Sequence, residues 1–192
     1  MPRPRTFDDA EVIEAAMQTF WARGYEGTSA EELCRRTGLG RGSLYNAFGA
    51  KQSLYEEAVR RYADATFDDL LAALERPGPV KERLRTFMYG VIDADVVDTD
   101  HRGCLVVNAA VEVSARSDVI RDVIRRQSSR MESTLCGVLL IAQRAGEISA
   151  GADPLRATRT ILAVLNGLRV LGKIATDRAM LTDAVDGVLA TL

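Results

Sequence analysis

Two short helices separated by a glycine-containing turn are predicted within residues 28–54, and this pattern constrains the fold more than any other stretch. Ser29 and Glu32 have the S-x-x-E spacing of a capping box, which predicts a helix over about 30–36 that ends before a glycine. A second helix is predicted over 43–48 and ends at another glycine. Two helices joined in this way are typical of a helix-turn-helix, whose second helix enters the major groove of DNA.

The second of these helices carries an apolar side and a polar side. Leu44 and Phe48 lie four residues apart, so we expect them to dock it on the first helix. The other side would present groups that suit DNA, because arginine hydrogen-bonds guanine, asparagine hydrogen-bonds adenine and hydroxyl groups bind phosphate. The candidate DNA contacts are Thr28, Ser29, Arg41, Gly42, Ser43, Tyr45, Asn46 and Lys51. An alternative interpretation of this segment is a helical hairpin that binds nothing.

The neighbouring residues carry a family resemblance. A predicted helix over 8–24 precedes the segment, and together they read F-x-x-x-G-Y-E-G-T-S-x-E-E-L-C-R-R-T-G-L-G-R-G-S-L-Y-N-A-F-G-A-K-Q-S-L. This run resembles the DNA-binding domain of the TetR family of bacterial transcriptional regulators over roughly the first 55 residues. Beyond them only the length and the helical layout agree. Ala47 departs from the family pattern, where many relatives carry histidine or another polar residue, so we expect no contact there.

Composition restricts the class of protein further. The chain has 192 residues, 47% of them hydrophobic and 27% charged, which is typical of ordinary soluble proteins. Its net charge is only -2, so DNA binding must rely on local basic groups such as Arg3 and Arg5 of a short N-terminal arm. The sequence has no apolar run of membrane-spanning length and no signal-peptide core. Three cysteines without paired spacing fit a reducing compartment, and we expect a cytoplasmic location.

The rest of the chain has helical periodicity, so we predict an all-α fold of about nine helices. The further predicted helices span about 52–75, 80–94, 104–116, 118–146, 153–176 and 182–192. The resemblance implies a helix-turn-helix domain over 1–50 and an effector-binding and dimerisation domain over 51–192. The helix over 51–76, roughly 35 Å long at about 1.5 Å per residue, is the expected mechanical link.

The segment 104–113 is apolar except for Asn108 and Glu112, which share one face. Buried polar groups need partners, and a small-molecule pocket lined by apolar residues is one answer. The candidate effector-pocket residues are Cys104, Asn108, Glu112, Asn166 and Arg169. In the alternative interpretation, Glu112 pairs with Arg116 and Asn108 bonds the backbone.

Cys104 follows Arg102 and a glycine at a predicted helix start, a position that favours a reactive thiol. In some members of the family that respond to electrophiles or oxidants, a similar Gly-Cys-Leu stretch carries the sensing thiol. The resemblance therefore implies that Cys104 could sense such compounds, with Lys173 as its cationic neighbour. An inert cysteine is the alternative.

The last two predicted helices carry wide apolar faces, which suggest a subunit interface. The expected interface residues are Ile161, Leu165, Leu168, Leu171, Leu181, Val185 and Val188. The resemblance implies that these helices form a four-helix bundle across a two-fold axis. Two copies of a short recognition helix would then meet a palindromic site on DNA.

The predicted function is that of a homodimeric transcriptional regulator, a repressor released from a palindromic operator in double-stranded DNA by a small-molecule effector. The alternative is a thiol-based redox or electrophile-sensing repressor acting through Cys104. An enzyme is not expected, because the single histidine, His101, lies in a predicted loop and there is no metal-ligand cluster or Ser/His/Asp set. We expect no cofactor, no metal and no membrane partner.

Overall fold

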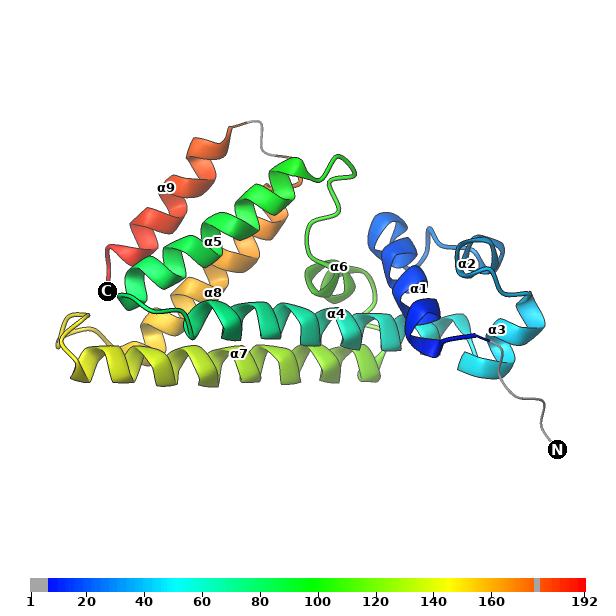
Figure 1. The fold of residues 1–192 in the computed structure, drawn as a ribbon, viewed down its shortest axis with the longest axis horizontal. Coiled ribbons are helices and arrows are strands. Elements are labelled where there is room, and N and C mark those ends of the chain that lie inside the picture. The colour runs from blue at the N-terminus through cyan, green and yellow to red at the C-terminus, as the bar shows by residue number, and fades with distance from the viewer. Residues whose placement is uncertain (1–6, 175–176) are drawn as a thin grey trace.

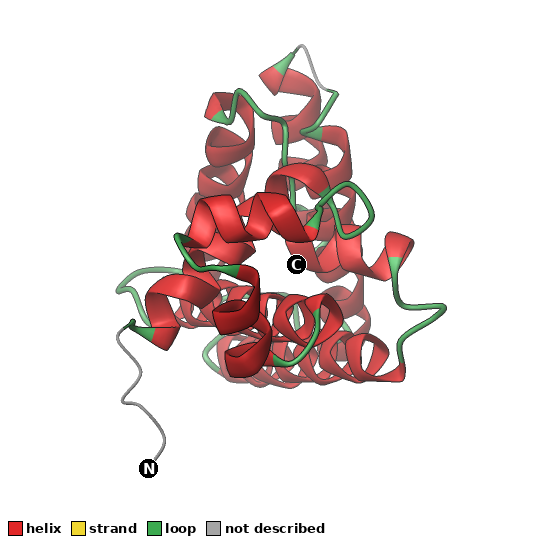
Figure 2. Ribbon diagram, turned by 90° about the vertical axis from the view of Figure 1, so that its right-hand side faces the viewer, coloured by secondary structure: helices red, strands yellow, loops and turns green. Residues whose placement is uncertain are grey.

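The computed structural model describes residues 7–174 and 177–192, and within these ranges it contains nine α-helices and no strand (Figures 1 and 2). The helices are α1 (Asp9–Arg23), α2 (Ala30–Thr37), α3 (Arg41–Phe48), α4 (Lys51–Leu74), α5 (Val80–Val97), α6 (Leu105–Glu112), α7 (Asp118–Arg144), α8 (Pro154–Leu171) and α9 (Arg178–Leu189). The all-α prediction is confirmed. The predicted basic arm with Arg3 and Arg5 and the predicted end of the eighth helix at 176 lie outside the described residues.

Helices α1, α2 and α3 form one end of the molecule (Figure 1). Side-chain caps begin the first two: the Asp8 carboxylate accepts a hydrogen bond from the backbone N–H of Ala10, and the Ser29 hydroxyl accepts one from Glu32 at 3.1 Å. Leu44 of α3 is fully buried in a core with Phe20 of α1, so α3 docks through its predicted apolar side.

Helix α4 belongs to two hydrophobic cores. At its start, Leu54 and Tyr55 pack in the N-terminal core, which also contains residues of α6 and the beginning of α7. At its end, Leu70 and Leu74 pack in a second core. α7 lies alongside α4 over most of its length, as Figure 1 shows. The same rigid helix therefore joins the N-terminal helices to the C-terminal helices.

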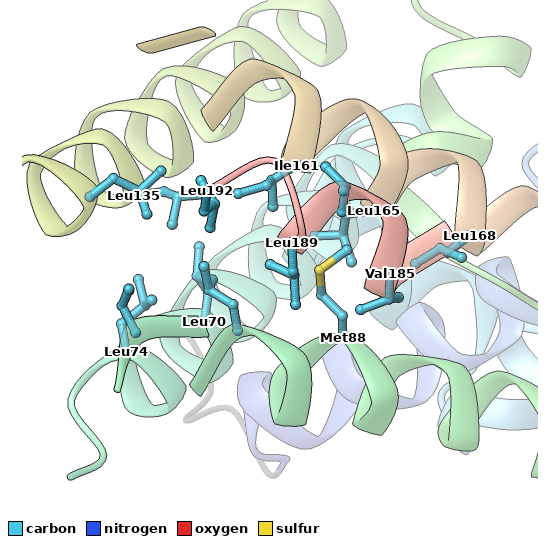
Figure 3. Close-up of a cluster of buried hydrophobic side chains, with 14 of the residues drawn as sticks. Leu70, Leu74, Met88, Leu135, Ile161, Leu165, Leu168, Val185, Leu189 and Leu192 are labelled. Atoms are coloured by element: carbon cyan, nitrogen blue, oxygen red, sulfur yellow. The ribbon is translucent and has the colours of Figure 1, made fainter. Parts of the chain in front are cut away.

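The second core is built by α4, α5, α7, α8 and α9 (Figure 3). Leucine, isoleucine, valine and methionine side chains from these helices fill it, among them Met88, Leu135 and Leu189. Asp153 fixes the start of α8 by accepting hydrogen bonds from the backbone N–H groups of Leu155 and Arg156. The apolar stripes of the C-terminal helices are thus largely used within one subunit.

Several helix boundaries differ from the sequence prediction. α5 continues to Val97, three residues beyond its predicted end, and α8 ends at Leu171, five residues before its predicted end. α3 begins at Arg41, two residues early, because the extended backbone of Gly40 serves as its N-cap. α6 ends at Glu112, because the chain turns there and Ser117 then caps α7. α9 begins at Arg178, where the Asp177 carboxylate caps it. None of the helices in the described ranges is both long and apolar enough to span a lipid bilayer.

Candidate nucleic-acid interface and effector cavity

Helix α3 presents a polar face at the end of the molecule. Arg41, Gly42, Ser43 and Asn46 are exposed, and Tyr45 is half-buried. The guanidinium carbon of Arg41 lies 5.9 Å from the centre of the Tyr45 ring, one helical turn away. This cation–π contact orders two long side chains on the same side of α3. The face therefore offers a guanidinium, an amide and two hydroxyl groups.

The two hydroxyl residues that precede α2 have different roles. Thr28 is fully buried, and its hydroxyl donates a hydrogen bond of 2.7 Å to the carbonyl of Gly24. Thr28 was a candidate DNA contact, but in this position it holds the turn between α1 and α2 and has no exposed group. Ser29 is exposed, and because its oxygen accepts from Glu32, its hydroxyl proton stays available for a phosphate.

Lys51 is the first residue of α4, where backbone N–H groups lack helical partners. Its ammonium nitrogen lies 4.3 Å from the centre of the Tyr25 ring. The ring restricts the lysine to the N-terminus of the helix, where the dipole also favours an anion. This geometry suits a phosphate contact.

A basic cluster at the end of α2 was not singled out from the sequence. Glu32 accepts hydrogen bonds from Arg35 at 2.6 Å and from Arg36 at 3.1 Å, and Arg23 lies 3.5 Å away. The hydrogen bonds from Arg35, followed by those from Arg36, lower the pKa of the Glu32 carboxyl. Three cations surround one anion, so the cluster carries excess positive charge. The i, i+3 and i, i+4 spacing was the available signal.

A cavity of about 970 Å³ lies between α1, α4, α5, α7 and α8. Its lining includes Met17 from α1 and Tyr62 from α4, which are buried, and Trp21 from α1, which is half-buried. The Trp21 and Tyr62 rings meet edge to face, with their centres 4.9 Å apart. Cys104 and Arg169 join the same wall. We call Met17, Trp21, Tyr62, Cys104 and Arg169 the buried wall; Met17 and Tyr62 are buried and the other three are half-buried.

Arg169 is held at the buried wall by three partners. Its guanidinium pairs with Asp95 at 2.9 Å and donates to the Tyr62 hydroxyl at 2.7 Å and the Gly103 carbonyl at 2.8 Å. Burial raises the pKa of the Asp95 carboxyl, and the charge of Arg169 opposes that shift. Burial also raises the pKa of the Tyr62 phenol. The wall is thus a network of paired polar groups rather than a free charge.

Three of the five predicted pocket residues line the cavity: Cys104, Asn166 and Arg169. Asn108 does not. Its amide nitrogen donates to the carbonyl of Arg102 at 2.9 Å, and its amide oxygen accepts from Lys173 at 3.3 Å. Asn108 therefore bonds the backbone, as in the alternative interpretation. Among the described residues, no three His, Cys, Asp or Glu side chains form a group suited to a metal ion.

Glu112 lies away from the cavity and binds the turn between α1 and α2. Its carboxylate accepts hydrogen bonds from the backbone N–H of Tyr25 at 2.9 Å and of Glu26 at 2.8 Å. The predicted partner, Arg116, instead pairs with Glu26 at 2.7 Å and donates to the carbonyl of Glu112. The half-buried Glu112 carboxylate is thus paired, as expected, but with backbone N–H groups and not with a ligand.

The loop before α6 makes a second contact with α1. The Arg102 guanidinium lies 4.2 Å from the centre of the Trp21 ring, pairs with Asp98 at 3.1 Å and donates to Gln18 at 2.8 Å. The Trp21 indole N–H donates to the carbonyl of Gly103 at 3.0 Å. That carbonyl also accepts from Arg169, so one oxygen connects α1 to the wall of the cavity. No local sequence pattern indicates these contacts.

The predicted dimer-interface residues lie mostly inside their own subunit. Six are at most 8% exposed and pack in the second core: Ile161, Leu165, Leu168, Leu181, Val185 and Val188. Figure 3 shows four of them, Ile161, Leu165, Leu168 and Val185, within that cluster. Because buried side chains cannot form a contact surface, this part of the prediction needs correction. Leu171, the seventh, is 39% exposed.

The fold and the exposed α3 define a helix-turn-helix regulatory protein. Residues 12–58 match the model of the bacterial regulatory proteins of the tetR family, and residues 80–188 match the tetracyclin repressor-like C-terminal domain. The chain therefore belongs to the TetR family of bacterial transcriptional regulators, as the sequence resemblance predicted.

Known relatives agree with this assignment. The chain is 31% identical over 193 residues to the uncharacterized HTH-type transcriptional regulator YezE of Bacillus subtilis, covering 100% of both chains. It is 26% identical over 171 residues to the transcriptional repressor ComR of Escherichia coli, covering 88% of this chain and 80% of ComR. Among solved structures, a cysteine mutant of the TetR-family regulator CifR complexed with 26-bp operator DNA is 28% identical, with a TM-score of 0.84 and 98% of each chain covered.

Proposed function

We propose that this protein is a homodimeric repressor that binds a palindromic operator through α3 and is released by a small molecule bound in the cavity. The exposed face of α3 is the observation that carries the proposal. Arg41 and Asn46 suit base edges, while Ser29, Ser43 and Lys51 suit phosphates. The DNA complex of the similar protein CifR supports this use of the domain.

Homodimerisation is proposed through the exposed face of α8, residues 172–174 that follow it, and the start of α9. Leu171 is 39% exposed, Ile174 75% and Met180 49%. Gly167, one turn before Leu171, has no atom within 4 Å of an added Cβ, so a partner helix could approach closely. Large exposed apolar side chains beside small residues suit a helical subunit interface. A two-fold dimer would present two copies of α3 to one operator.

This interface is tested by Leu171→Glu, which would place a charge on the contact surface. We expect a shift from dimer to monomer in light scattering coupled to size-exclusion chromatography. Val111→Glu is the control, because Val111 is 85% exposed on α6, which is not part of the proposed face. A Leu171→Glu variant that remains dimeric at low micromolar concentration would place the interface elsewhere.

Release would follow from a change in the relative position of the two α3 helices. Trp21 of α1 and Tyr62 of α4 both line the cavity. A ligand there would contact two helices that contribute to the N-terminal core. A ligand shifts the equilibrium only by its difference in affinity for the two states, typically about 1–3 kcal/mol. That corresponds to a 5- to 150-fold change in operator affinity.

Operator binding is tested with duplex DNA selected from a random pool by the purified protein. We expect Tyr45→Ala and Lys51→Ala each to weaken binding at least tenfold, since each contact occurs twice in a dimer. Arg125→Ala removes the same charge from an exposed position on α7 and should leave affinity within twofold. Lys51→Ala should also reduce the salt dependence of binding. Unchanged affinity in both test variants would contradict the proposed docking.

Thiol-based sensing through Cys104 is the second candidate function. Cys104 lines the cavity, half-buried, at the N-cap of α6, which is the observation in its favour. Lys173 is close by, since its side chain would lie 2.9 Å from a Cβ added at Gly103. In this case oxidants would release the operator from the wild type but not from Cys104→Ser. Oxidant-sensitive binding that persists in Cys104→Ser would exclude the thiol mechanism.

A further inference from the structure

We infer that the effector is an uncharged aromatic molecule that binds against Trp21 and therefore touches the DNA-binding end of the chain directly. This inference rests on the proposed function of the cavity and specifies its ligand class. Three features of the buried wall support it: the shape of the wall, its charge and the helix that supplies Trp21.

The shape of the wall favours a flat apolar ligand. Trp21 and Tyr62 meet edge to face at 4.9 Å, and Met17 adds a flexible thioether beside them. Aromatic rings bind one another in offset-stacked or edge-to-face arrangements, and methionine sulfur packs well against rings. With a volume of about 970 Å³, the cavity has room for a molecule of two or three rings.

The charges of the wall are already paired. Of the three arginines that line the cavity in the described ranges, Arg169 is the least exposed, with a side chain 13% exposed. Its guanidinium already bonds Asp95, which is 6% exposed. A carboxylate or sulfonate ligand would bring a second anion to the same guanidinium, beside Asp95. A cationic ligand at the wall would meet the Arg169 guanidinium, because the acidic residues that line the cavity are Asp69, which is exposed, and Glu132, which already pairs with Arg159. Burying an unpaired charge is costly, so the wall selects an uncharged ligand.

The position of Trp21 connects this ligand to α1. The Trp21 indole donates to the Gly103 carbonyl, which Arg169 also binds. A ligand that displaces the Trp21 ring breaks the hydrogen bond from α1 to the Gly103 carbonyl. A ligand that displaces the Arg169 guanidinium removes the second donor to that carbonyl. The signal therefore need not travel first through the length of α4.

The chain offers a direct probe, because Trp21 is its only tryptophan. N-phenyl-1-naphthylamine is uncharged and accepts energy from excited tryptophan. 8-Anilinonaphthalene-1-sulfonate is the same molecule with one added sulfonate. We expect saturable energy transfer from Trp21 to the uncharged dye in the wild-type dimer. The uncharged dye should bind at least tenfold more tightly than the sulfonate, a difference of about 1.4 kcal/mol.

A filling variant locates the dye. Gly90 lines the cavity on α5, and a Cβ added there meets no atom within 4 Å, so Gly90→Phe should fold and occupy the space. Gly137→Phe is the matched control, since Gly137 on α7 is equally open but does not line the cavity. Energy transfer should be lost in Gly90→Phe and retained in Gly137→Phe.

The outcomes are distinct from those of the operator test. Equal or tighter binding of the sulfonate, no saturable binding of the uncharged dye, or a signal that persists in Gly90→Phe would each overturn the ligand class. Operator binding is measured without dye, on the same proteins. If the protein binds no DNA while the uncharged dye behaves as expected, the proposed function fails and the ligand class stands.

Discussion

Replacing Glu112 by alanine should loosen the contact between α6 and the turn that connects α1 to α2. The Glu112 carboxylate is the acceptor for two backbone N–H groups, those of Tyr25 and Glu26. The N–H of Glu26 lies in an exposed bond and can turn to water after the substitution. The N–H of Tyr25 lies in a partly buried bond and loses its acceptor. The free energy of unfolding should therefore fall by the contribution of about one hydrogen bond to a charged group, and not of two.

The expected magnitude follows from that count. A hydrogen bond to a charged group contributes about 1.5–3 kcal/mol, and a stranded buried donor costs a similar amount. For a chain of this size each kcal/mol lowers the melting temperature by about 2–4 °C. Glu112→Ala should thus melt about 3–12 °C below the wild type. Glu112→Gln, which keeps a neutral acceptor, should lose about half as much.

Thermal melts at one protein concentration measure the effect, because dimer stability depends on concentration. Glu26→Gln is the control: it breaks the exposed ion pair with Arg116, where both side chains are more than half exposed, and leaves both backbone bonds intact. Hydrogen exchange at the Tyr25 amide should accelerate in Glu112→Ala only. If Glu112→Ala melts within about 1 °C of the wild type, the two hydrogen bonds of Glu112 do not stabilise the fold.

Further predictions concern single residues. Ser29→Ala removes the N-cap of α2 and should lower the free energy of unfolding by about 1 kcal/mol in urea titrations; no change would mean that the cap is redundant. Gly103→Ala adds a Cβ only 2.8 Å from the Arg169 carbonyl oxygen at a φ of +63°, and should cost about 1–3 kcal/mol in the same titration. The pKa of Glu32 is lower in the folded protein than its ordinary value of 4.5, so the ionised carboxylate stabilises the fold above pH 4.5. This stabilisation is lost as the pH falls through the lower folded pKa. Arg35→Ala should therefore reduce the loss of stability between pH 7 and pH 3, and an unchanged pH profile would contradict this.

The helix-turn-helix could be predicted from the sequence because its signals are local. The Ser29 cap, the glycines that end the helices and the four-residue spacing of Leu44 and Phe48 all lie within one short segment. Each signal depends on backbone geometry or on residues one turn apart. The predicted polar face of α3 is accordingly exposed in the structure.

The dimer face could not be assigned in the same way. Periodicity identifies an apolar stripe but not which surface covers it, and the stripes containing Leu165 and Val185 are covered by helices of the same chain. The role of Glu112 was equally hidden, because its partners lie 86 and 87 residues away in the sequence. Contacts at such separations leave no local pattern. The same is true of Trp21 and Gly103.

Because α4 contributes to both hydrophobic cores, it limits where two such regulators can be joined to make a chimaera. The N-terminal core includes four side chains from α4: Leu54, Tyr55, Ala58 and Tyr62. A fragment cut at residue 50 would expose that interior, so the first 50 residues are not a module that folds alone. A chimaera that grafts a foreign DNA-binding segment must splice inside α4, beyond Tyr62, and must supply a matching surface for α6.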